Sequence, residues 1–168
     1  MAILVSDSSV LFDLERGGFL ESAFACGLPM VVPDLLFENE LRDYNGTYFQ
    51  KLGLSVTSLN SDEVELAQDI QAHRPTLSLE DCFALVCAGR KEHILLAGDA
   101  TLRKEASARK IVCRGVLWLL DEMFATGTVS AHHLCEGLTR IKQDKRCRLP
   151  KTDLESRIKK WCNSSIPK

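Results

Sequence analysis

The stretch ILVSDSSVLFDLERGGFL, residues 3–20, joins a strand-like run directly to a helix-like run. Residues 3–5 are continuously apolar, as in a strand that is buried on both faces, and from Ser8 onward the apolar residues recur at helical spacing. Asp7 lies at the junction, where the strand ends. Because a buried strand that leads into a helix is typical of a parallel sheet, this stretch indicates an α/β fold.

The same alternation continues to about residue 115. Further strands are predicted at residues 30–32, 53–59, 94–98 and 111–113, and helices at 19–26, from 33 onward, and at 63–72, 78–91 and 102–108. The pattern predicts a three-layer α/β/α fold with a central, mostly parallel sheet of about four or five strands. After residue 116 the pattern is helical only, with helices expected at 116–125, 130–144 and 153–162.

Length and composition predict one domain. A chain of 168 residues with 45% hydrophobic content is long enough for one well-packed core and short for two. We expect a single domain over residues 1–168, with a core of about residues 1–115 and a C-terminal helical extension of residues 116–168. Within that extension, Trp118 is expected in the core or at a subunit interface, and a homodimer is a reasonable assembly.

Charge and cysteine content narrow the class of protein. A net charge of −2 argues against binding nucleic acid through a global basic field. Seven cysteines, an odd count without a CxxC pair, predict free thiols in a reducing cytoplasm; a disulfide framework is the less favoured alternative. No run approaches the roughly 18 apolar residues of a membrane span, and no basic segment precedes the first apolar run. We therefore expect a cytoplasmic protein without a membrane segment.

Four acidic side chains are predicted to meet at one edge of the sheet. Asp7 and Asp99 each follow a buried strand, and Asp81 lies three residues after Ser78, the spacing of a helix capping box. Glu40 lies in the helical segment that follows the strand at 30–32, as does Glu38. Because parallel strands end, and the following helices begin, at the edge where α/β proteins bind ligands, these acids should converge there.

Converging carboxylates repel one another, and a divalent cation is the simplest compensation. Oxygen ligands without histidine or paired cysteines favour Mg²⁺ or Mn²⁺ over zinc. Taken singly, each acid also has an ordinary explanation. Asp7, Asp81 and Asp99 fit helix caps or turns, and a glutamate on an exposed helix is usually solvated.

Four motifs in this order resemble the PIN-domain nucleases, a family that includes the VapC-like ribonuclease toxins. They are ILVSDSSVLFDLERGGFL (3–20), PDLLFENEL (33–41), LSLEDCFALVCA (77–88) and ILLAGDATLRKEA (94–106). Two departures are present. Ala97 stands where the family often has threonine, and the second motif offers both Glu38 and Glu40, of which Glu40 is favoured because an apolar residue follows it.

The resemblance implies a metal-dependent ribonuclease, the toxin of a toxin–antitoxin pair that is neutralised by a small antitoxin protein. It implies that one or two Mg²⁺ or Mn²⁺ ions are held by Asp7, Glu40, Asp81 and Asp99. Ser8 or Ser9 could orient a carboxylate. Arg103 and Lys104 could contact phosphate, or could be solvated helix residues.

Two other functions stay open from the sequence. The missing threonine at Ala97 fits a PIN-like binding or assembly module that is weakly active or inactive. The same acids could also serve a phosphatase that acts on small phosphate esters.

Overall fold

A computed structural model describes residues 1–164 of the chain. Its sheet consists of β1 (Ile3–Ser6), β2 (Met30–Pro33), β3 (Ser55–Thr57), β4 (His93–Leu96) and β5 (Cys113–Arg114). All neighbouring strands are parallel, in the order β3-β2-β1-β4-β5. The predicted parallel sheet is thereby confirmed, with five strands.

Helices connect the strands and continue after the last of them. The connecting helices are α1 (Ser8–Gly17), α2 (Leu20–Ala25), α3 (Asp34–Leu36), the π-helical segment η1 (Phe37–Gly46), α4 (Thr47–Leu52), α5 (Ser61–His73), α6 (Leu79–Ala88) and α7 (Ala100–Ala108). The C-terminal helices are α8 (Val116–Ala125), α9 (Ala131–Gln143) and α10 (Lys151–Ser164). None of the helices in this part of the chain is both long and apolar enough to cross a membrane.

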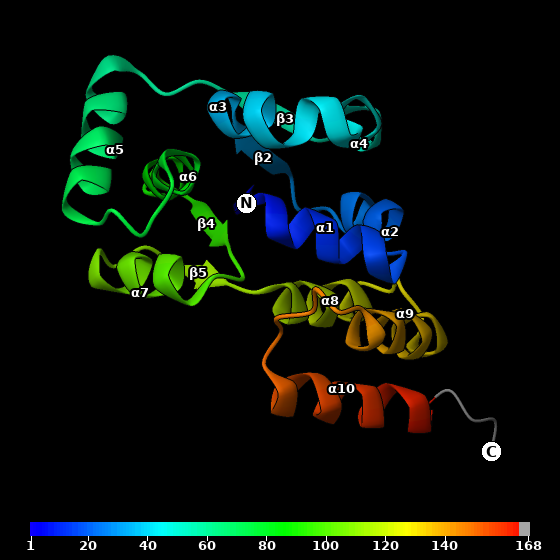
Figure 1. Cartoon of the computed structure of the whole chain (residues 1–168). Coiled ribbons are helices and arrows are strands. Elements are labelled where there is room, and N and C mark those ends of the chain that lie inside the picture. Colours follow the sequence, from blue (N-terminus) through cyan, green and yellow to red (C-terminus); the bar gives the residue numbers. More distant parts are fainter. Residues whose placement is uncertain (165–168) are drawn as a thin grey trace.

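The helices form layers on the two faces of the sheet (Figure 1). Right-handed crossovers put α1 and α2 on one face, where the chain moves from β1 to β2, and α5, α6 and α7 on the other, where it returns to β4 and β5. Leu4, Val5, Leu95 and Leu96 are fully buried between these layers. The three-layer α/β/α prediction is confirmed.

The C-terminal helices pack on the α1 side of the sheet (Figure 1). α9 crosses α1 at very close range, since a Cβ atom on Gly137 would lie 2.5 Å from the Gly17 carbonyl oxygen. Side chains of α9 also donate to the last carbonyls of α1: Arg140 Nη2 to Gly17 (2.8 Å) and His133 Nε2 to Gly18 (2.9 Å). These bonds satisfy acceptors that a helix C-terminus leaves without partners.

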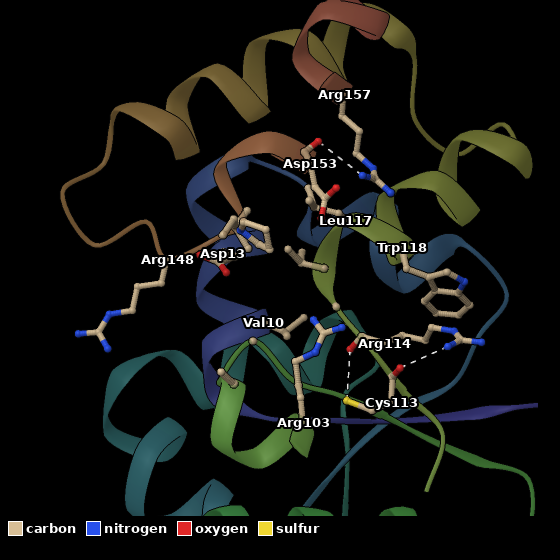
Figure 2. A pocket seen from close by; sticks show the side chains of 16 residues that line it. Val10, Asp13, Arg103, Cys113, Arg114, Leu117, Trp118, Arg148, Asp153 and Arg157 are labelled. Carbon is tan, nitrogen blue, oxygen red and sulfur yellow. Dashed lines mark hydrogen bonds between the residues drawn. The ribbon is translucent and has the colours of Figure 1, made fainter. Parts of the chain in front are cut away.

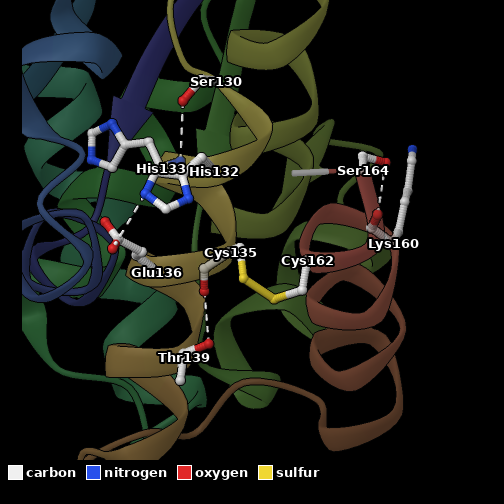
Figure 3. The surroundings of a disulfide bond; sticks show 9 residues. All are labelled: Ser130, His132, His133, Cys135, Glu136, Thr139, Lys160, Cys162 and Ser164. Carbon is white, nitrogen blue, oxygen red and sulfur yellow. Dashed lines mark hydrogen bonds and ion pairs between the residues drawn. A yellow bond between two sulfur atoms is a disulfide. The ribbon is translucent and has the colours of Figure 1, made fainter. Parts of the chain in front are cut away.

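α10 is held on α9 by a disulfide between Cys135 and Cys162 (Figure 3). The prediction of free thiols throughout is wrong for this pair, because the packing of two helices brings together cysteines that are 27 residues apart. Trp161 on the same helix is buried and lies 4.2 Å, between ring centres, from Phe124 of α8.

Several predicted boundaries shift by a few residues. Pro33 ends β2 instead of starting a helix, and β5 begins two residues later than predicted. α10 starts at Lys151, two residues before the predicted start at 153. The predicted capping box from Ser78 to Asp81 is present, and Asn60 forms another with Glu63 at the start of α5. The helical region after β2 has a kink at Asn45.

Candidate active site

The candidate site lies where the direction of the sheet order reverses. β1 and β4 are neighbours, yet the chain leaves them toward opposite edges of the sheet, and such a switch point is where open α/β sheets bind ligands. The backbone N–H of Asp7 donates to the Leu96 carbonyl oxygen at 2.9 Å, so the two strand ends are joined at this point. The N–H of Gly98 in turn donates to Asp7 Oδ2 at 3.3 Å.

Asp7 is a buried carboxylate with a full set of donors around it. Its side chain is the N-cap of α1, and its Oδ1 accepts from Ser9 Oγ (2.8 Å) and from the Val10 N–H (3.0 Å). Burial is the main cause that raises the pKa of Asp7, the hydrogen bonds lower it, and the charge of Asp81 raises it slightly; together these effects bring the pKa to about 6. The raised pKa therefore reflects a carboxylate that is buried away from water and lies near the carboxylate of Asp81.

Glu40 lies on η1 and approaches the same region. Burial raises the pKa of Glu40, a hydrogen bond from the Ser8 side chain lowers it, and the charges of Glu80 and Asp81 raise it. A hydrogen bond of 2.7 Å from Asn39 Nδ2 to Glu80 Oε1 ties η1 to the start of α6. Of the two candidate glutamates, Glu40 is thus the one near Asp7's neighbour Asp81.

Glu38 faces another way. Its half-exposed side chain pairs with Arg42 on the same helical segment. The two glutamates of the second motif therefore have different surroundings, although they are only two residues apart.

Asp81 and Asp99 also lie at helix N-termini. Asp81 Oδ2 accepts from the Ser78 N–H (3.2 Å), and Ser78 Oγ accepts from the Asp81 N–H (3.0 Å), which completes the predicted capping box of α6. Asp99 is exposed and is the N-cap of α7, with Oδ1 accepting from the Leu102 N–H at 2.9 Å. The ordinary capping roles are therefore real for both residues.

The structure brings Asp81 within electrostatic reach of both Asp7 and Glu40. Asp81 acts on the pKa of both Asp7 and Glu40, whereas Asp99 is connected to them through the backbone of Gly98, which contacts Asp7. Within residues 1–164, no three His, Cys, Asp or Glu side chains lie close enough together to hold a metal ion as they stand. The N-termini of α1, α6 and α7 supply partial positive charge that stabilises the crowded carboxylates.

These residues fit a hard divalent cation in the type of donor. All four offer carboxylate oxygens, and burial, with a smaller effect of neighbouring acids, raises the pKa of Asp7 and Glu40. Asp7, Glu40, Asp81 and Asp99 are the residues that would hold it.

Two neighbouring cavities lie beside the acidic residues. The smaller, of about 320 Å³, is lined by Ser9 and Asp99 of the acidic site and by Arg146 and Arg148 of the segment between α9 and α10. The larger, of about 530 Å³, shares Asp13, Gly98, Arg148 and Leu149 with it and continues toward the start of α8 (Figure 2).

Sequence reasoning missed most of the residues that line the larger cavity. Trp118 is half-buried: it packs against the core and also lines the cavity wall, with Arg114 beside it. Arg103 lines this cavity, whereas its neighbour Lys104 lines neither of the two. The signal that could have indicated them is the sequence RGVLW at 114–118. There an arginine precedes a glycine and a tryptophan follows it by three residues, at a predicted strand-to-helix turn.

A family model described as a PIN domain matches residues 3–163 of the chain. No curated protein and no solved structure matches it significantly.

Proposed function

Since the chain belongs to the PIN-domain family of nucleases, we propose that it is a metal-dependent ribonuclease that hydrolyses phosphodiester bonds of RNA at the acidic site. The observation that carries the proposal is the buried carboxylate of Asp7 at the switch point between β1 and β4, next to the charge of Asp81. A carboxylate whose pKa is raised to about 6 by burial, with an acidic neighbour, is typical of a functional site.

In this proposal the four acids act through their fixed positions. The Ser9 hydroxyl and the Val10 and Gly98 N–H groups orient both oxygens of Asp7, and the Ser8 side chain orients Glu40. When bound, Mg²⁺ or Mn²⁺ supplies a Lewis acid that polarises phosphate oxygens and makes water more acidic. The chain itself provides oxygen ligands whose backbone supports are already in place.

The proposed reaction is simple hydrolysis. A water oxygen forms a bond to phosphorus, the bond from phosphorus to the 3′-oxygen breaks, and the departing oxygen takes up a proton. One product fragment carries a 5′-phosphate and the other a 3′-hydroxyl. The second proton of the water is shared by the phosphate and solvent.

A matched pair of glutamate variants tests this proposal. Glu40→Gln should lower the rate of RNA cleavage by roughly 100-fold or more, because a lost ligand removes several kcal/mol of transition-state stabilisation. Glu38→Gln, two residues away on η1, should keep the rate within about twofold of the parent. Cleavage is followed on labelled RNA with Mg²⁺ or Mn²⁺ and with a chelator. Equal loss in both variants, or cleavage in the presence of the chelator, would refute the assignment.

We further propose that the protein is the cytoplasmic toxin of a toxin–antitoxin pair, with a small antitoxin covering the acidic site. The order of the four acidic motifs supports this part of the proposal. Expression should arrest growth in a way that depends on Asp7, and co-expression of a small protein encoded beside it should restore growth. Arrest by Asp7→Asn as well would contradict it.

A second candidate is a PIN-like binding or assembly module. Two observations favour it: Ala97, fully buried just before the acidic motif, offers no hydroxyl, and no three acids are gathered within ligand distance in residues 1–164. The two candidates differ in their response to metal. For the ribonuclease, Mn²⁺ should raise the melting temperature, and the rise should shrink in Asp99→Asn. No rise would favour the module.

A further inference from the structure

We propose that the larger cavity next to the acidic site is a nucleotide-binding subsite, in which Trp118 stacks on one unpaired base of the RNA strand and Arg103 and Arg114 bind the adjoining phosphate. The inference rests on the proposed ribonuclease function and adds to it a site outside the four acids. It is carried by the position, charge and shape of the cavity.

The cavity adjoins the acidic site. Gly98, whose N–H contacts Asp7, lines both cavities, and so does Arg148. A strand whose phosphate reaches the carboxylates would therefore extend into this cavity within a few nucleotides. Its volume of about 530 Å³ lies within the range of roughly 300–1,000 Å³ that is usual for small-ligand sites.

Positive charge dominates the cavity wall. Four arginines and two aspartates line it, namely Arg103, Arg114, Arg148 and Arg157 against Asp13 and Asp153. Asp13 already pairs with Arg16 at 3.0 Å, and Arg157 pairs with Asp121 at 2.7 Å. Within the described residues, Arg103, Arg114 and Arg148 form no ion pair, so their charges are available to an anion.

Arg103 and Arg114 flank the first turn of α8. In Figure 2, Arg103 reaches toward the middle of the cavity, Arg114 lies beneath Trp118, and Arg148 points away from both. A Cβ atom on Gly115 would lie 3.1 Å from Arg103 Nη1, so the absence of a side chain at Gly115 lets the guanidinium approach the helix start. Gly115 provides no side-chain cap for α8, and the free N–H groups of its first turn add to the positive field.

Trp118 gives the cavity a flat apolar wall beside these cations. The guanidinium carbon of Arg114 lies 6.0 Å from the centre of the indole ring. An aromatic face next to arginines is the usual arrangement for binding a base and its phosphate, because every base can stack and every phosphate pairs with a guanidinium. A segment of an acidic protein would use the cations but would not stack on the exposed part of the indole ring, which favours a nucleotide.

The test measures binding separately from cleavage. Asp7→Asn protein, in which we expect cleavage to be lost, is titrated with a short single-stranded oligoribonucleotide in Mg²⁺ while tryptophan fluorescence is recorded. Trp161 is buried, so quenching should come from Trp118 and should disappear in Trp118→Phe. Arg103→Gln and Arg114→Gln should each weaken binding by roughly 5- to 10-fold. Lys91→Gln, an exposed charge at the opposite edge of the sheet, is the matched control and should change binding less than twofold.

The same strand annealed to its complement should not quench Trp118, since its bases are already paired. In the active enzyme, Trp118→Ala and Arg114→Gln should raise KM and leave kcat within about twofold. Unchanged KM in both variants, with cleavage still dependent on Glu40, would overturn the subsite and leave the ribonuclease intact. Quenching in Asp7→Asn, together with no RNA cleavage by the parent protein in Mg²⁺ or Mn²⁺, would refute the ribonuclease and support the cavity as a nucleotide site. An oligoaspartate peptide that binds more tightly than the strand would assign the cavity to a protein partner and overturn the proposal.

Discussion

The acidic site and the arginine-lined cavity lie side by side but are supported in different ways. Asp7, Asp81 and Asp99 are fixed by hydrogen bonds with backbone N–H groups at the starts of α1, α6 and α7. Arg103 and Arg114 are exposed side chains, and the wall around them requires α8 and the segment before α10 to pack on α1. The acidic site is therefore a property of the sheet, whereas the cavity is a property of how the C-terminal helices dock onto it.

This difference separates the expected effects of mutation. Changes at the sheet edge should alter cleavage while the helices stay in place. Mutations at the contacts among α1, α9 and α10 should alter stability. They should change the shape of the cavity more than the positions of the carboxylates.

The strongest test of the comparison is Asp7→Asn, which should lower RNA cleavage by roughly 100-fold or more and yet stabilise the metal-free protein. The pKa of Asp7 is about 6 in the folded chain against an ordinary value of 3.8, so the ionised carboxyl destabilises the fold above pH 6. That cost is absent below about pH 3.8, where the carboxyl is protonated in both states. We expect the free energy of unfolding to rise by about 1–2 kcal/mol at pH 8, an increase that is limited because asparagine loses the Gly98 contact. Near pH 3.5 we expect almost no increase.

Urea unfolding at the two pH values, without divalent metal, measures this gain. A lower unfolding free energy for Asp7→Asn at pH 8 would show that the carboxylate is needed for the fold itself.

A second test removes the link between α9 and α10. Cys162→Ser, or reduction of the parent protein, should lower the free energy of unfolding by about 3 kcal/mol under otherwise oxidising conditions, because the bond closes a loop with a sequence separation of 27. Cys147→Ser, a half-buried free cysteine in the segment before α10, is the control and should respond to dithiothreitol as the parent does. The kcat for RNA should be unchanged by reduction. Identical midpoints with and without reductant would contradict the expected role of the bond.

A third test widens the contact between α1 and α9. Gly137→Ala places a Cβ atom 2.2 Å from Phe19 Cζ and 2.5 Å from the Gly17 carbonyl oxygen, so the helices must separate. The overpacking should cost about 1–3 kcal/mol in thermal unfolding. Glu136→Ala, the exposed preceding residue, should stay within about 0.5 kcal/mol of the parent. If both variants melt alike, the close approach of the helices does not contribute to stability.

The smallest effect is expected on the sheet face away from the C-terminal helices. Arg90 donates two hydrogen bonds of 2.8 Å to Glu63, and this pairing lowers the pKa of Glu63 to about 2 from an ordinary 4.5. A lowered acid pKa adds stability above pH 4.5 that is lost as the pH falls toward 2. Because both groups are partly exposed, the contribution should be about 1 kcal/mol or less.

Arg90→Gln should flatten the stability profile between pH 4.5 and 2 and leave cleavage at neutral pH unchanged. Urea midpoints across this range measure it. A profile as steep as that of the parent would mean that other carboxylates cause the acid dependence.

The parts of the molecule that the sequence predicts well are those whose causes are local. The apolar run before Asp7 and the capping box from Ser78 to Asp81 each determine their own structure, and the right-handed crossover rule then brings their ends to one edge. The same rule accounts for the confirmed order of the layers. The different surroundings of Glu38 and Glu40 at that edge come from tertiary contacts, which the sequence pattern does not give.

The parts that sequence reasoning missed depend on contacts between distant elements. Cys135 and Cys162 each fit an apolar helix pattern, and nothing in either helix indicates that their faces meet. Trp118 has the sequence pattern of a core residue. How much of it is exposed depends on where the distant segment before α10 passes, which the pattern does not show. Such features depend on docking angles between helices, which a one-dimensional pattern does not encode.

The pairing of β1 with β4 has a consequence for how the protein is made. The first strand ends at Ser6, but its neighbour on one side, β4, begins only at His93. A chain growing on the ribosome therefore carries Asp7 until synthesis has passed His93, because only then has the strand that completes its surroundings been made. The centre of the sheet closes late in translation, so a truncated chain that stops short of β4 cannot assemble the acidic site.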